Sequence, residues 1–490
     1  MSDIIVIKNF INGQFVGSKE YLDSFDPATG RLNARIPDSD TADVAQAVKA
    51  AKKAFKEWSS KDPSYRSKLM HRVADILESR SEEFAIAETK DQGKPLWLSK
   101  TVEIPRAVLN FRHFANTILN DTELCIPQEE DGILNYTTRS ACGVAACIVP
   151  WNLPLYLLTF KLAPAIAYGN TVVVKPSEFT SVTAWMLCSV LKEAGFPDGV
   201  VNMLFGYGPK AGEALIRHPD VSLITFTGSD RAGLHIAEVA APVPKKVSLE
   251  MGGKNPAIVF SDADLDSCVP ALIKASFLNE GQVCLSSSRI YVEKKIFPQF
   301  VEKFVAETKK LKVGNPLESG TFLGPVCSKV HFEKIKSYLK IAEQEGATFL
   351  TKNEKPDLAE ENKNGYFLSP VVLTGLPDDS RCMQEEIFGP VTCLSTFENI
   401  SDVIKRANNV NYGLSASIWS KDLQKIHTVA PKLEVGTVWC NCWLVRNLHM
   451  PFGGEKRSGM GREGTEDSRE FFTYKRSICI KYTTEGNMFM

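Results

Sequence analysis

Hydrophobic residues recur every three or four positions over residues 41–58, 65–89 and 100–119. This spacing is typical of helices, so each stretch is predicted to be a helix, and 41–58 is predicted to be amphipathic. Gly93 is a plausible stop for the second helix, because glycine readily adopts the conformation that ends helices. Nearer the start, Asn12-Gly13 lies between apolar residues and predicts a tight turn between two strands.

From Cys142 onward, short apolar runs rich in β-branched residues alternate with helical patterns. The first set of predicted strands is 144–149, 171–175, 200–205, 223–227 and 256–260, with helices over 181–194 and 210–218 between them. A second set of strands follows at 289–292, 391–395, 415–418 and 437–440. Such alternation is typical of α/β folds with largely parallel sheets, and the first set has the doubly wound pattern of nucleotide-binding domains.

Two further predicted strands, 132–138 and 478–482, have little local partner in the sequence. Unpaired strands expose backbone hydrogen-bonding groups, so these two could pair with another subunit.

Composition excludes several classes of protein. The 490 residues carry 57 basic and 58 acidic side chains, without the basic block that is typical of nucleic-acid or membrane-surface binding. The most apolar stretch, 154–169, is interrupted by Lys161 and Pro164 and makes a poor membrane span. The first ten residues do not look like a signal peptide. Twelve cysteines without zinc-site spacing fit a reducing compartment, so we expect a cytosolic protein without a metal.

Several short segments, in a fixed order, carry candidate chemistry. They are Pro150-Trp151-Asn152, Lys175-Pro176-Ser177-Glu178, Phe226-Thr227-Gly228-Ser229, Leu249-Glu250-Met251-Gly252-Gly253-Lys254, Gly281-Gln282-Val283-Cys284, Glu385-Glu386-Ile387-Phe388-Gly389-Pro390 and Pro451-Phe452-Gly453-Gly454. Each segment alone is weak evidence, but the ordered set resembles the aldehyde dehydrogenase superfamily over essentially the whole chain. The resemblance implies a Rossmann-like NAD-binding domain (1–120 and 142–252), an α/β catalytic domain (253–467) and a small β oligomerisation arm (121–141 and 468–490). It also implies a homodimer or homotetramer.

Oxidation of an aldehyde to an acid needs a nucleophile, a base and donors for the oxyanion, because hydride leaves only after the carbonyl carbon has been attacked. By resemblance the nucleophile is Cys284, although most cysteines are buried for structural reasons. Glu250 resembles the base that activates the hydrolytic water, with a solvated turn as the alternative. Asn152 resembles the oxyanion donor, with a turn asparagine as the alternative. Cys440 and Cys442 are interpreted as packing residues.

The usual dinucleotide fingerprint is absent, because the third glycine after Gly206 and Gly208 falls one residue late. By resemblance, pyrophosphate binds instead where Gly228-Ser229 opens a helix. The remaining cofactor-binding residues that the resemblance implies are Trp151, Lys175, Glu178, Glu386 and Phe388. A carboxylate at position 178 accepts from the ribose 2′-hydroxyl and repels a 2′-phosphate, which predicts NAD over NADP.

The segments around 104–112 and 441–446 resemble the branch of the family that oxidises 2-aminomuconic semialdehyde, an intermediate of tryptophan catabolism by the kynurenine route. This substrate carries a carboxylate as well as the aldehyde, and arginine binds carboxylates with two parallel hydrogen bonds. Arg106 and Arg446 are the candidates. The alternatives are an internal salt bridge for Arg446 and pairing with Glu103 for Arg106, while Arg112 is expected at the surface.

Other functions remain open at this point. 2-Hydroxymuconic semialdehyde or retinal is an alternative substrate, although a retinoid would gain nothing from buried cations. A CoA-acylating enzyme would not need Glu250 to activate water. A non-enzymatic, crystallin-like role is disfavoured because both Cys284 and Glu250 are present.

Overall fold

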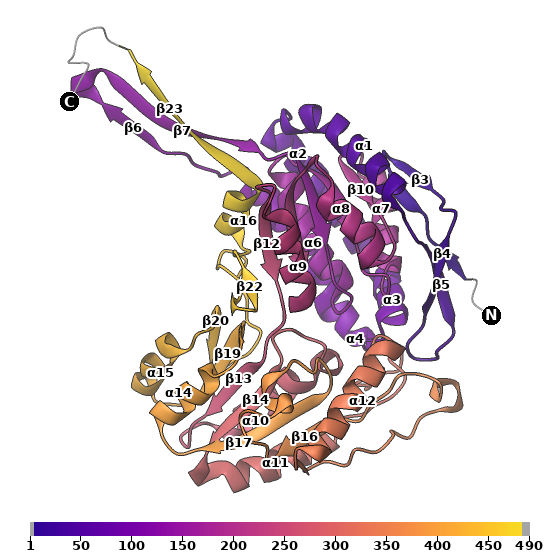
Figure 1. The fold of residues 1–490 in the computed structure, drawn as a ribbon, viewed down its shortest axis with the longest axis vertical. Helices are drawn as coiled ribbons and strands as arrows, with labels where there is room; N and C mark the ends of the chain where they lie inside the picture. Colours follow the sequence, from indigo (N-terminus) through magenta and orange to yellow (C-terminus); the bar gives the residue numbers. More distant parts are fainter. Residues whose placement is uncertain (1–3, 483–490) are drawn as a thin grey trace.

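The computed structural model describes residues 4–482, and its body is built on two largely parallel β-sheets with helices on both faces (Figure 1). In the first sheet, five parallel strands are flanked by antiparallel β22 on one side and by the antiparallel pair β2 and β3 on the other. In spatial order its strands are β22 (Gly459–Met460), β12 (Lys246–Glu250), β11 (Val221–Thr227), β8 (Val144–Ile148), β9 (Thr171–Lys175), β10 (Val201–Met203), β2 (Asn9–Ile11) and β3 (Gln14–Val16).

Successive residues of the central strands are buried on opposite faces of this sheet, as alternation along a strand requires. One face packs against α1 (Thr41–Ser59), α8 (Glu213–Arg217) and α9 (Asp230–Ala240). The other face packs against α2 (Pro63–Ser79), α3 (Ser81–Gln92), α5 (Ile104–Thr117), α6 (Pro154–Ala167) and α7 (Val182–Glu193). Burial of both faces explains why these strands are continuous apolar runs in the sequence.

The second sheet has six parallel strands and one antiparallel edge strand. In order they are β15 (Thr348–Phe349), β16 (Val371–Thr374), β17 (Val391–Phe397), β14 (Ser287–Glu293), β13 (Asn255–Val259), β19 (Ser415–Trp419) and β20 (Thr437–Cys440). Helices α10 (Leu265–Phe277) and α11 (Phe297–Lys309) cover one face. The other face packs against α12 (Lys329–Gln344), α13 (Arg381–Gln384), α14 (Ile400–Asn408) and α15 (Leu423–Val429).

A three-stranded antiparallel arm extends from the body (Figure 1). It consists of β6 (Cys125–Gln128), β7 (Ile133–Ala141) and β23 (Thr473–Lys481), and α16 (Thr465–Phe472) leads into it. The two strands predicted at 132–138 and 478–482 are not isolated, because β6 pairs with β7, and β7 and β23 pair with each other over nine residues. More than 300 residues separate them in the chain, so no local pattern indicates the pairing.

Smaller elements complete the fold. They are β1 (Ile5–Val6), β4 (Tyr21–Phe25), β5 (Leu32–Pro37), α4 (Leu96–Leu98), β18 (Tyr412–Gly413) and β21 (Glu455–Lys456). Asn12 and Gly13 have φ of 50° and 75°, so the predicted turn between β2 and β3 is confirmed. Gly93 ends α3 in the left-handed conformation, also as predicted.

Three predicted elements need correction. The helix predicted over 65–89 is two helices, because the chain breaks at Arg80 between α2 and α3. The helix predicted over 100–119 begins with a π-helical turn, Ser99–Glu103, and only then becomes α5. The strand predicted at 256–260 is β13, which belongs to the second sheet, and the fifth central strand of the first sheet is β12. The α/β class itself is confirmed.

The strand order of the first sheet reverses between β8 and β11, since β9 continues on one side and β12 on the other. Ligands of doubly wound folds bind at the carboxyl ends of the strands beside such a reversal. Asn152 follows β8 and Gly228 follows β11 at this edge.

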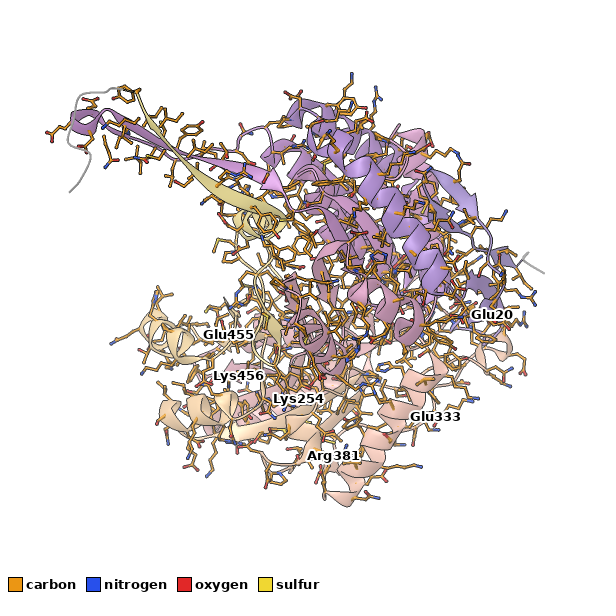
Figure 2. All side chains as sticks on the ribbon, turned by 45° about the horizontal axis from the view of Figure 1, so that its top comes forward. Glu20, Lys254, Glu333, Arg381, Glu455 and Lys456 are labelled. Carbon is orange, nitrogen blue, oxygen red and sulfur yellow. The ribbon has the colours of Figure 1, made fainter. Side chains whose placement is uncertain are left out.

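Figure 2 shows charged side chains such as Glu333 and Arg381 around the outside of the second sheet, whereas Lys254 is buried.

None of the helices within residues 4–482 is both long enough and apolar enough to cross a membrane. In the same part of the chain, no group of three or more His, Cys, Asp or Glu side chains is arranged to hold a metal ion.

Candidate active site

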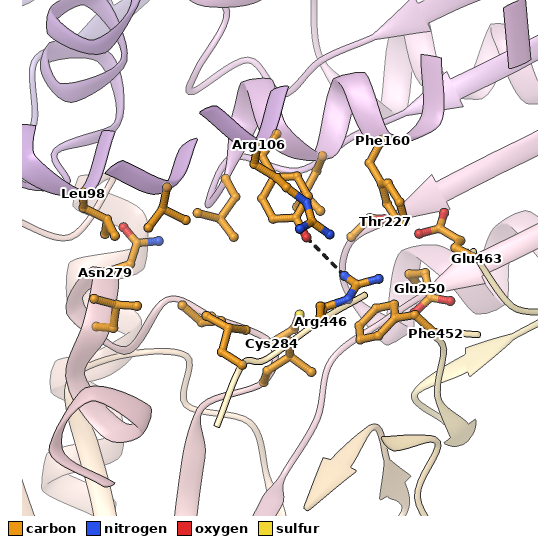
Figure 3. Close-up of a pocket in the computed structure, with 18 of the residues that line it drawn as sticks. Leu98, Arg106, Phe160, Thr227, Glu250, Asn279, Cys284, Arg446, Phe452 and Glu463 are labelled. Carbon is orange, nitrogen blue, oxygen red and sulfur yellow. Dashed lines mark hydrogen bonds between the residues drawn. The ribbon is translucent and has the colours of Figure 1, made fainter. Parts of the chain in front are cut away.

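Two cavities meet at Cys284. A cavity of about 400 Å³ is lined by Cys284, Glu250, Arg106 and Arg446, among other residues (Figure 3). A second cavity of about 240 Å³ also reaches Cys284. Its lining includes Trp151, Asn152, Gly228, Ser229, Glu386 and Phe388. The three predicted catalytic residues and five of the seven predicted cofactor residues therefore lie around these two spaces.

Cys284 follows a loop with unusual backbone geometry. Asn279, Glu280 and Gly281 have φ of 53°, 57° and 71°, which is the left-handed region that side chains other than glycine rarely adopt. Buried hydrogen bonds hold the loop: Asn279 Nδ2 donates to the Asn152 carbonyl at 3.0 Å, and Glu280 Oε1 accepts from the Gly324 amide at 2.7 Å. Strain of this kind persists only where the surroundings enforce it, and it often marks a functional site.

Burial, together with the nearby carboxylates of Glu386 and Glu250, raises the pKa of the Cys284 thiol to about 12. The thiol is therefore protonated at neutral pH. A nucleophilic thiolate forms there only if a nearby base accepts the proton or a bound cation stabilises the charge.

Glu250, at the end of β12, is buried, and neither carboxylate oxygen has a hydrogen-bond partner within residues 4–482. Burial, with Glu463 as the next cause, raises its pKa well above the ordinary value of 4.5. A carboxylate with a raised pKa and free oxygens can act as a general base. Gly453 lies against it, because a Cβ at position 453 would be 2.9 Å from Glu250 Oε1.

Asn152 is buried, and its side-chain amide Nδ2 donates to the Gln282 carbonyl at 2.9 Å. An amide nitrogen carries two hydrogens, so one remains for an oxyanion. The Gln282 side chain in turn accepts from the Cys327 amide at 3.0 Å. Asn152 is thus tied to the loop that carries Cys284.

The second cavity has an aromatic wall and a carboxylate. The Trp151 ring lies 5.4 Å from Phe388 and 4.8 Å from His331. Glu386 Oε1 accepts from the Gly253 amide at 3.0 Å, and a Cβ at Gly252 would stand 2.1 Å from Glu386 Oε2. Only glycine at position 252 leaves enough space for the Glu386 carboxylate. Burial raises the pKa of Glu386 to about 7.

Lys175 and Glu178 lie outside the linings of both cavities. Lys175, at the end of β9, is buried and donates to the Pro176 carbonyl at 2.7 Å. Its ammonium group is 3.7 Å from Glu178 Oε2. Ser229 caps α9 by accepting from the Ala232 amide at 3.3 Å. All three lie at the carboxyl edge of the first sheet.

The two arginines have few protein partners. Within residues 4–482, the buried Nε and Nη2 of Arg106 have no hydrogen-bond partner. Glu103 does not pair with Arg106; it binds Lys94 Nζ at 2.9 Å and the Tyr156 amide at 2.9 Å. The predicted alternative for Arg106 is therefore wrong. Arg112, as expected, is a surface residue paired with Asp75 and Glu78.

Arg446 donates to the hydroxyl of Tyr156 at 3.1 Å and lies over the ring of Phe452, 3.7 Å from its centroid. No ion pair joins it to a carboxylate among the described residues, so the internal salt bridge considered as its alternative is not formed. Arg106 lies 5.3 Å from the ring centroid of the same Tyr156.

Sequence reasoning missed Tyr156, His331 and the buried pair of Lys161 and Glu463, whose Nζ and Oε1 are 2.5 Å apart. Lys161 offered a signal, because a lysine inside an apolar helix needs a buried partner. The position of that partner, 302 residues away, was not predictable.

Comparison with known proteins identifies the family. The family model described as the aldehyde dehydrogenase family matches residues 15–478. The chain belongs to the aldehyde dehydrogenase family. It is therefore an oxidoreductase that acts on the aldehyde group of its substrate.

Among members of the aldehyde dehydrogenase family, the chain is 52% identical to the 2-aminomuconic semialdehyde dehydrogenase of Homo sapiens, over 98% of this chain and 99% of that protein. It is 43% identical to the 2-hydroxymuconic semialdehyde dehydrogenase of Pseudomonas sp. (strain CF600), over 97% and 99%. An NAD+ complex of aldehyde dehydrogenase from Bacillus cereus superposes with a TM-score of 0.93 at 36% identity, covering 97% of each chain. The fold predicted from the resemblance is confirmed.

Proposed function

We propose that the protein oxidises 2-aminomuconic semialdehyde to 2-aminomuconate with NAD, through a covalent intermediate on Cys284. The observation that carries the proposal is one cavity that holds a cysteine, a carboxylate without hydrogen-bond partners and two arginines without carboxylate partners, as far as the described residues 4–482 go. The cysteine and the carboxylate supply the chemistry, and the arginines supply binding for an anionic substrate.

The first step is attack of the Cys284 sulfur on the aldehyde carbon, with the thiol proton passing to Glu250. The carbonyl oxygen becomes an oxyanion, which accepts hydrogen bonds from Asn152 Nδ2 and the Cys284 amide. One such donor lowers the barrier by about 3–4 kcal/mol in a site without water. Collapse of this tetrahedral thiohemiacetal leaves a thioester on Cys284. Glu250 first releases the thiol proton to solvent and then takes a proton from water, whose oxygen attacks the thioester carbon. The bond from carbon to the Cys284 sulfur breaks, the sulfur takes the proton back from Glu250, and the acid is released.

NAD supplies the acceptor for the hydride that leaves the tetrahedral carbon. The second cavity fits its nicotinamide ribose, because Glu386 presents a carboxylate to a space kept open by Gly252 and walled by Trp151 and Phe388. The amino end of α9 beside Gly228 and Ser229 would hold the pyrophosphate. Lys175 and Glu178 would hold the adenosine ribose. The NAD+ complex of the aldehyde dehydrogenase from Bacillus cereus, which has the same fold, supports this assignment.

Two observations support the choice of substrate. The names of the relatives at 52% and 43% identity are those of dehydrogenases for 2-aminomuconic and 2-hydroxymuconic semialdehyde. Arg106 and Arg446 supply the cations that a terminal carboxylate needs. 2-Hydroxymuconic semialdehyde is a second candidate on the same grounds. Retinal is disfavoured, because burying two arginines beside an apolar ligand costs free energy.

The division into NAD-binding (1–120 and 142–252), catalytic (253–467) and arm (121–141 and 468–490) regions is part of the proposal. The arm is proposed to pair with a second copy in a homodimer or homotetramer. In support, it exposes large apolar side chains, namely Leu124, Ile126, Tyr474, Ile480 and Tyr482. A cytosolic location is proposed because all twelve cysteines are free thiols.

The test is steady-state oxidation with NAD of 2-hydroxymuconic semialdehyde, a stand-in for the less stable amino compound, and of a neutral aldehyde of similar length. We expect a strong preference for the anionic substrate, and mass spectrometry of quenched turnover should find an acyl group on Cys284. Equal kcat/KM values for the two aldehydes would contradict the assigned substrate. Acyl transfer to added CoA faster than hydrolysis would contradict the assigned role of Glu250 in water activation.

A further inference from the structure

Arg446 lies close to a carboxylate with which it forms no ion pair. Its charge lowers the pKa of Glu250 against the larger effects of burial and Glu463, so the two side chains interact through space. Figure 3 shows Arg446 beside Glu250 and Phe452. The charged and titratable groups that face Glu250 are Glu463, Lys161, Arg446, Arg462 and Cys284.

An unpaired arginine and a buried carboxylate without hydrogen bonds attract each other strongly in a low-dielectric cavity. Contact between them would satisfy Glu250, whose two oxygens lack partners among the described residues. Such contact would also impair both groups. Glu250 would become a weaker base, and the charge of Arg446 would no longer be available to the substrate. Something must therefore hold Arg446 away from Glu250.

The hydroxyl of Tyr156 is the polar group that holds it, accepting from Arg446 Nη1 at 3.1 Å. The rings of Phe452 and Phe160 lie 3.7 and 5.2 Å from the guanidinium carbon and guide its plane. Rings alone permit sliding, whereas a hydrogen bond to a charged donor fixes one nitrogen.

Tyr156 is itself firmly placed in the first turn of α6. Its amide donates to Glu103 Oε1 at 2.9 Å, and the other Glu103 oxygen accepts from Lys94 Nζ at 2.9 Å. Its carbonyl accepts from Asn110 Nδ2 at 3.2 Å. The guanidinium of Arg106 covers its ring. A fixed backbone and a covered ring leave the hydroxyl little freedom to follow Arg446.

We propose that Tyr156 is a positioning residue that keeps Arg446 directed to the substrate and away from Glu250. The proposal rests on the roles proposed above for Arg446 and Glu250. It assigns to one hydroxyl both the preference for an anionic substrate and the basicity of the catalytic carboxylate.

The test is Tyr156→Phe, which removes the hydroxyl and keeps the ring. We expect kcat/KM for 2-hydroxymuconic semialdehyde to fall about 10-fold, the usual effect of losing a hydrogen bond to a charged group. The neutral aldehyde should lose less. The acid limb of the kcat profile should move to lower pH by about one unit, because a cation at contact distance lowers a carboxyl pKa. Tyr168→Phe is the matched control, since within residues 4–482 its buried hydroxyl has no partner.

A double-mutant cycle with Arg446→Met separates positioning from a general structural effect. If Tyr156 acts through Arg446, Tyr156→Phe adds nothing in the Arg446→Met background. Additive losses, or an unmoved acid limb in Tyr156→Phe, would overturn the proposal. If Arg446→Met itself keeps the preference for the anionic aldehyde, the proposed function fails first. Thermal unfolding of each variant, run beside Tyr168→Phe, shows whether any loss reflects folding.

Discussion

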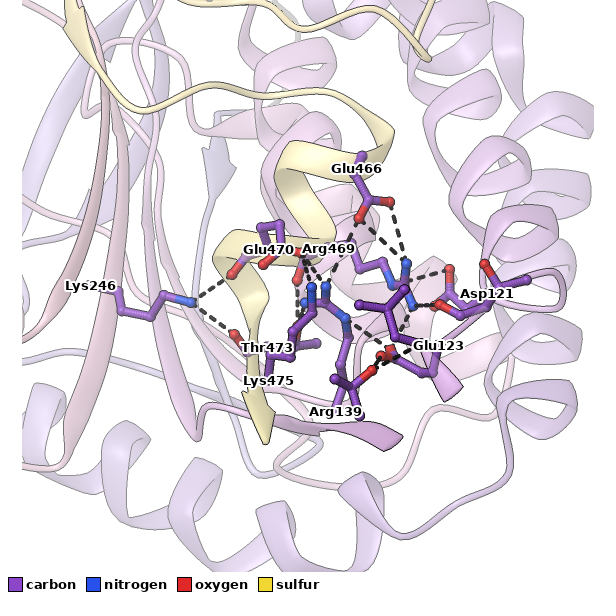
Figure 4. A network of polar contacts seen from close by, with 12 residues as sticks. Asp121, Glu123, Arg139, Lys246, Glu466, Arg469, Glu470, Thr473 and Lys475 are labelled. Carbon is purple, nitrogen blue, oxygen red and sulfur yellow. Dashed lines mark hydrogen bonds and ion pairs between the residues drawn. The ribbon is translucent and has the colours of Figure 1, made fainter. Parts of the chain in front are cut away.

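Two pairs of arginines in this protein have opposite surroundings. At the root of the arm, Arg139 and Arg469 lie among carboxylates (Figure 4). Arg139 binds Glu123 at 3.0 Å and also Glu470, and Arg469 binds Glu123 at 2.7 Å. In the 400 Å³ cavity, Arg106 and Arg446 have no such partners among the described residues.

The difference separates arginines whose charge stabilises the fold from arginines whose charge is available to bind a ligand. Both arm-root arginines are only 9% exposed, and the ion pairs with their carboxylates offset the cost of removing these charges from water. Burial of the cavity arginines also costs desolvation free energy, which no carboxylate among the described residues offsets. A substrate with a carboxylate would offset this desolvation cost on binding. In this way local instability of the free enzyme contributes to substrate specificity.

The largest expected effect concerns Glu250 in the same cavity, whose carboxylate oxygens have no hydrogen-bond partner among the described residues. We expect Glu250→Gln to lower kcat by about 10²–10⁴-fold, because the amide is no base. The same change should raise stability at neutral pH. A carboxyl pKa that folding raises destabilises the folded state as pH rises from the unfolded pKa toward the folded one, and glutamine removes this cost. Steady-state kinetics and thermal unfolding measure both, and a fully active variant would refute the assignment.

The opposite result is expected at the arm root. Arg139→Met should lower the free energy of unfolding by about 1–3 kcal/mol, less than for a fully buried pair because its carboxylates are partly exposed. Substrate preference should not change. Chemical denaturation is the measurement, and Arg112→Met, whose partners are exposed, is the control. A loss no greater than in the control would break the comparison.

Arg106→Met should change stability by less than about 1 kcal/mol, in either direction, because no ion pair with the described residues is lost and one buried charge is removed. Run beside Arg139→Met, it gives the most direct contrast in folding energy. A destabilisation as large as that of Arg139→Met would mean that Arg106 supports the fold.

The smallest effect is an acid sensitivity of the arm root. The hydrogen bond from Arg139 holds the pKa of Glu470 at about 2. A lowered carboxyl pKa contributes stability that is present above the ordinary value of 4.5 and is lost as pH falls toward 2. Glu470→Gln should therefore flatten the loss of stability in that interval. An unchanged pH profile would show that Glu470 contributes nothing there.

Much of this fold was predictable, for identifiable reasons. The strands 171–175 and 437–440 were predicted to the residue, because apolar runs end sharply there. The break at Arg80 was not, because Ser79-Arg80-Ser81 contains neither proline nor glycine. Pairing of β7 with β23 depends on tertiary structure alone.

The site was predictable where motifs marked it and not where contacts span the chain. Cys284, Glu250 and Asn152 belong to recognisable segments, and the structure brings them together. The bond from Arg446 to Tyr156 joins positions 290 apart. Neither residue carries a local signal of the other, so only the folded chain reveals the contact.

The central claim is that Arg106 and Arg446, which have no carboxylate partner among the described residues, bind the carboxylate of the substrate. The most direct test is the ratio of kcat/KM for 2-hydroxymuconic semialdehyde to that for a neutral aldehyde, in the wild type and in Arg446→Met. Loss of a buried charge pairing costs about 2–5 kcal/mol, so the ratio should fall by about 30-fold or more. An unchanged ratio, or an equal loss for both aldehydes, would contradict the account and leave Arg446 a structural residue.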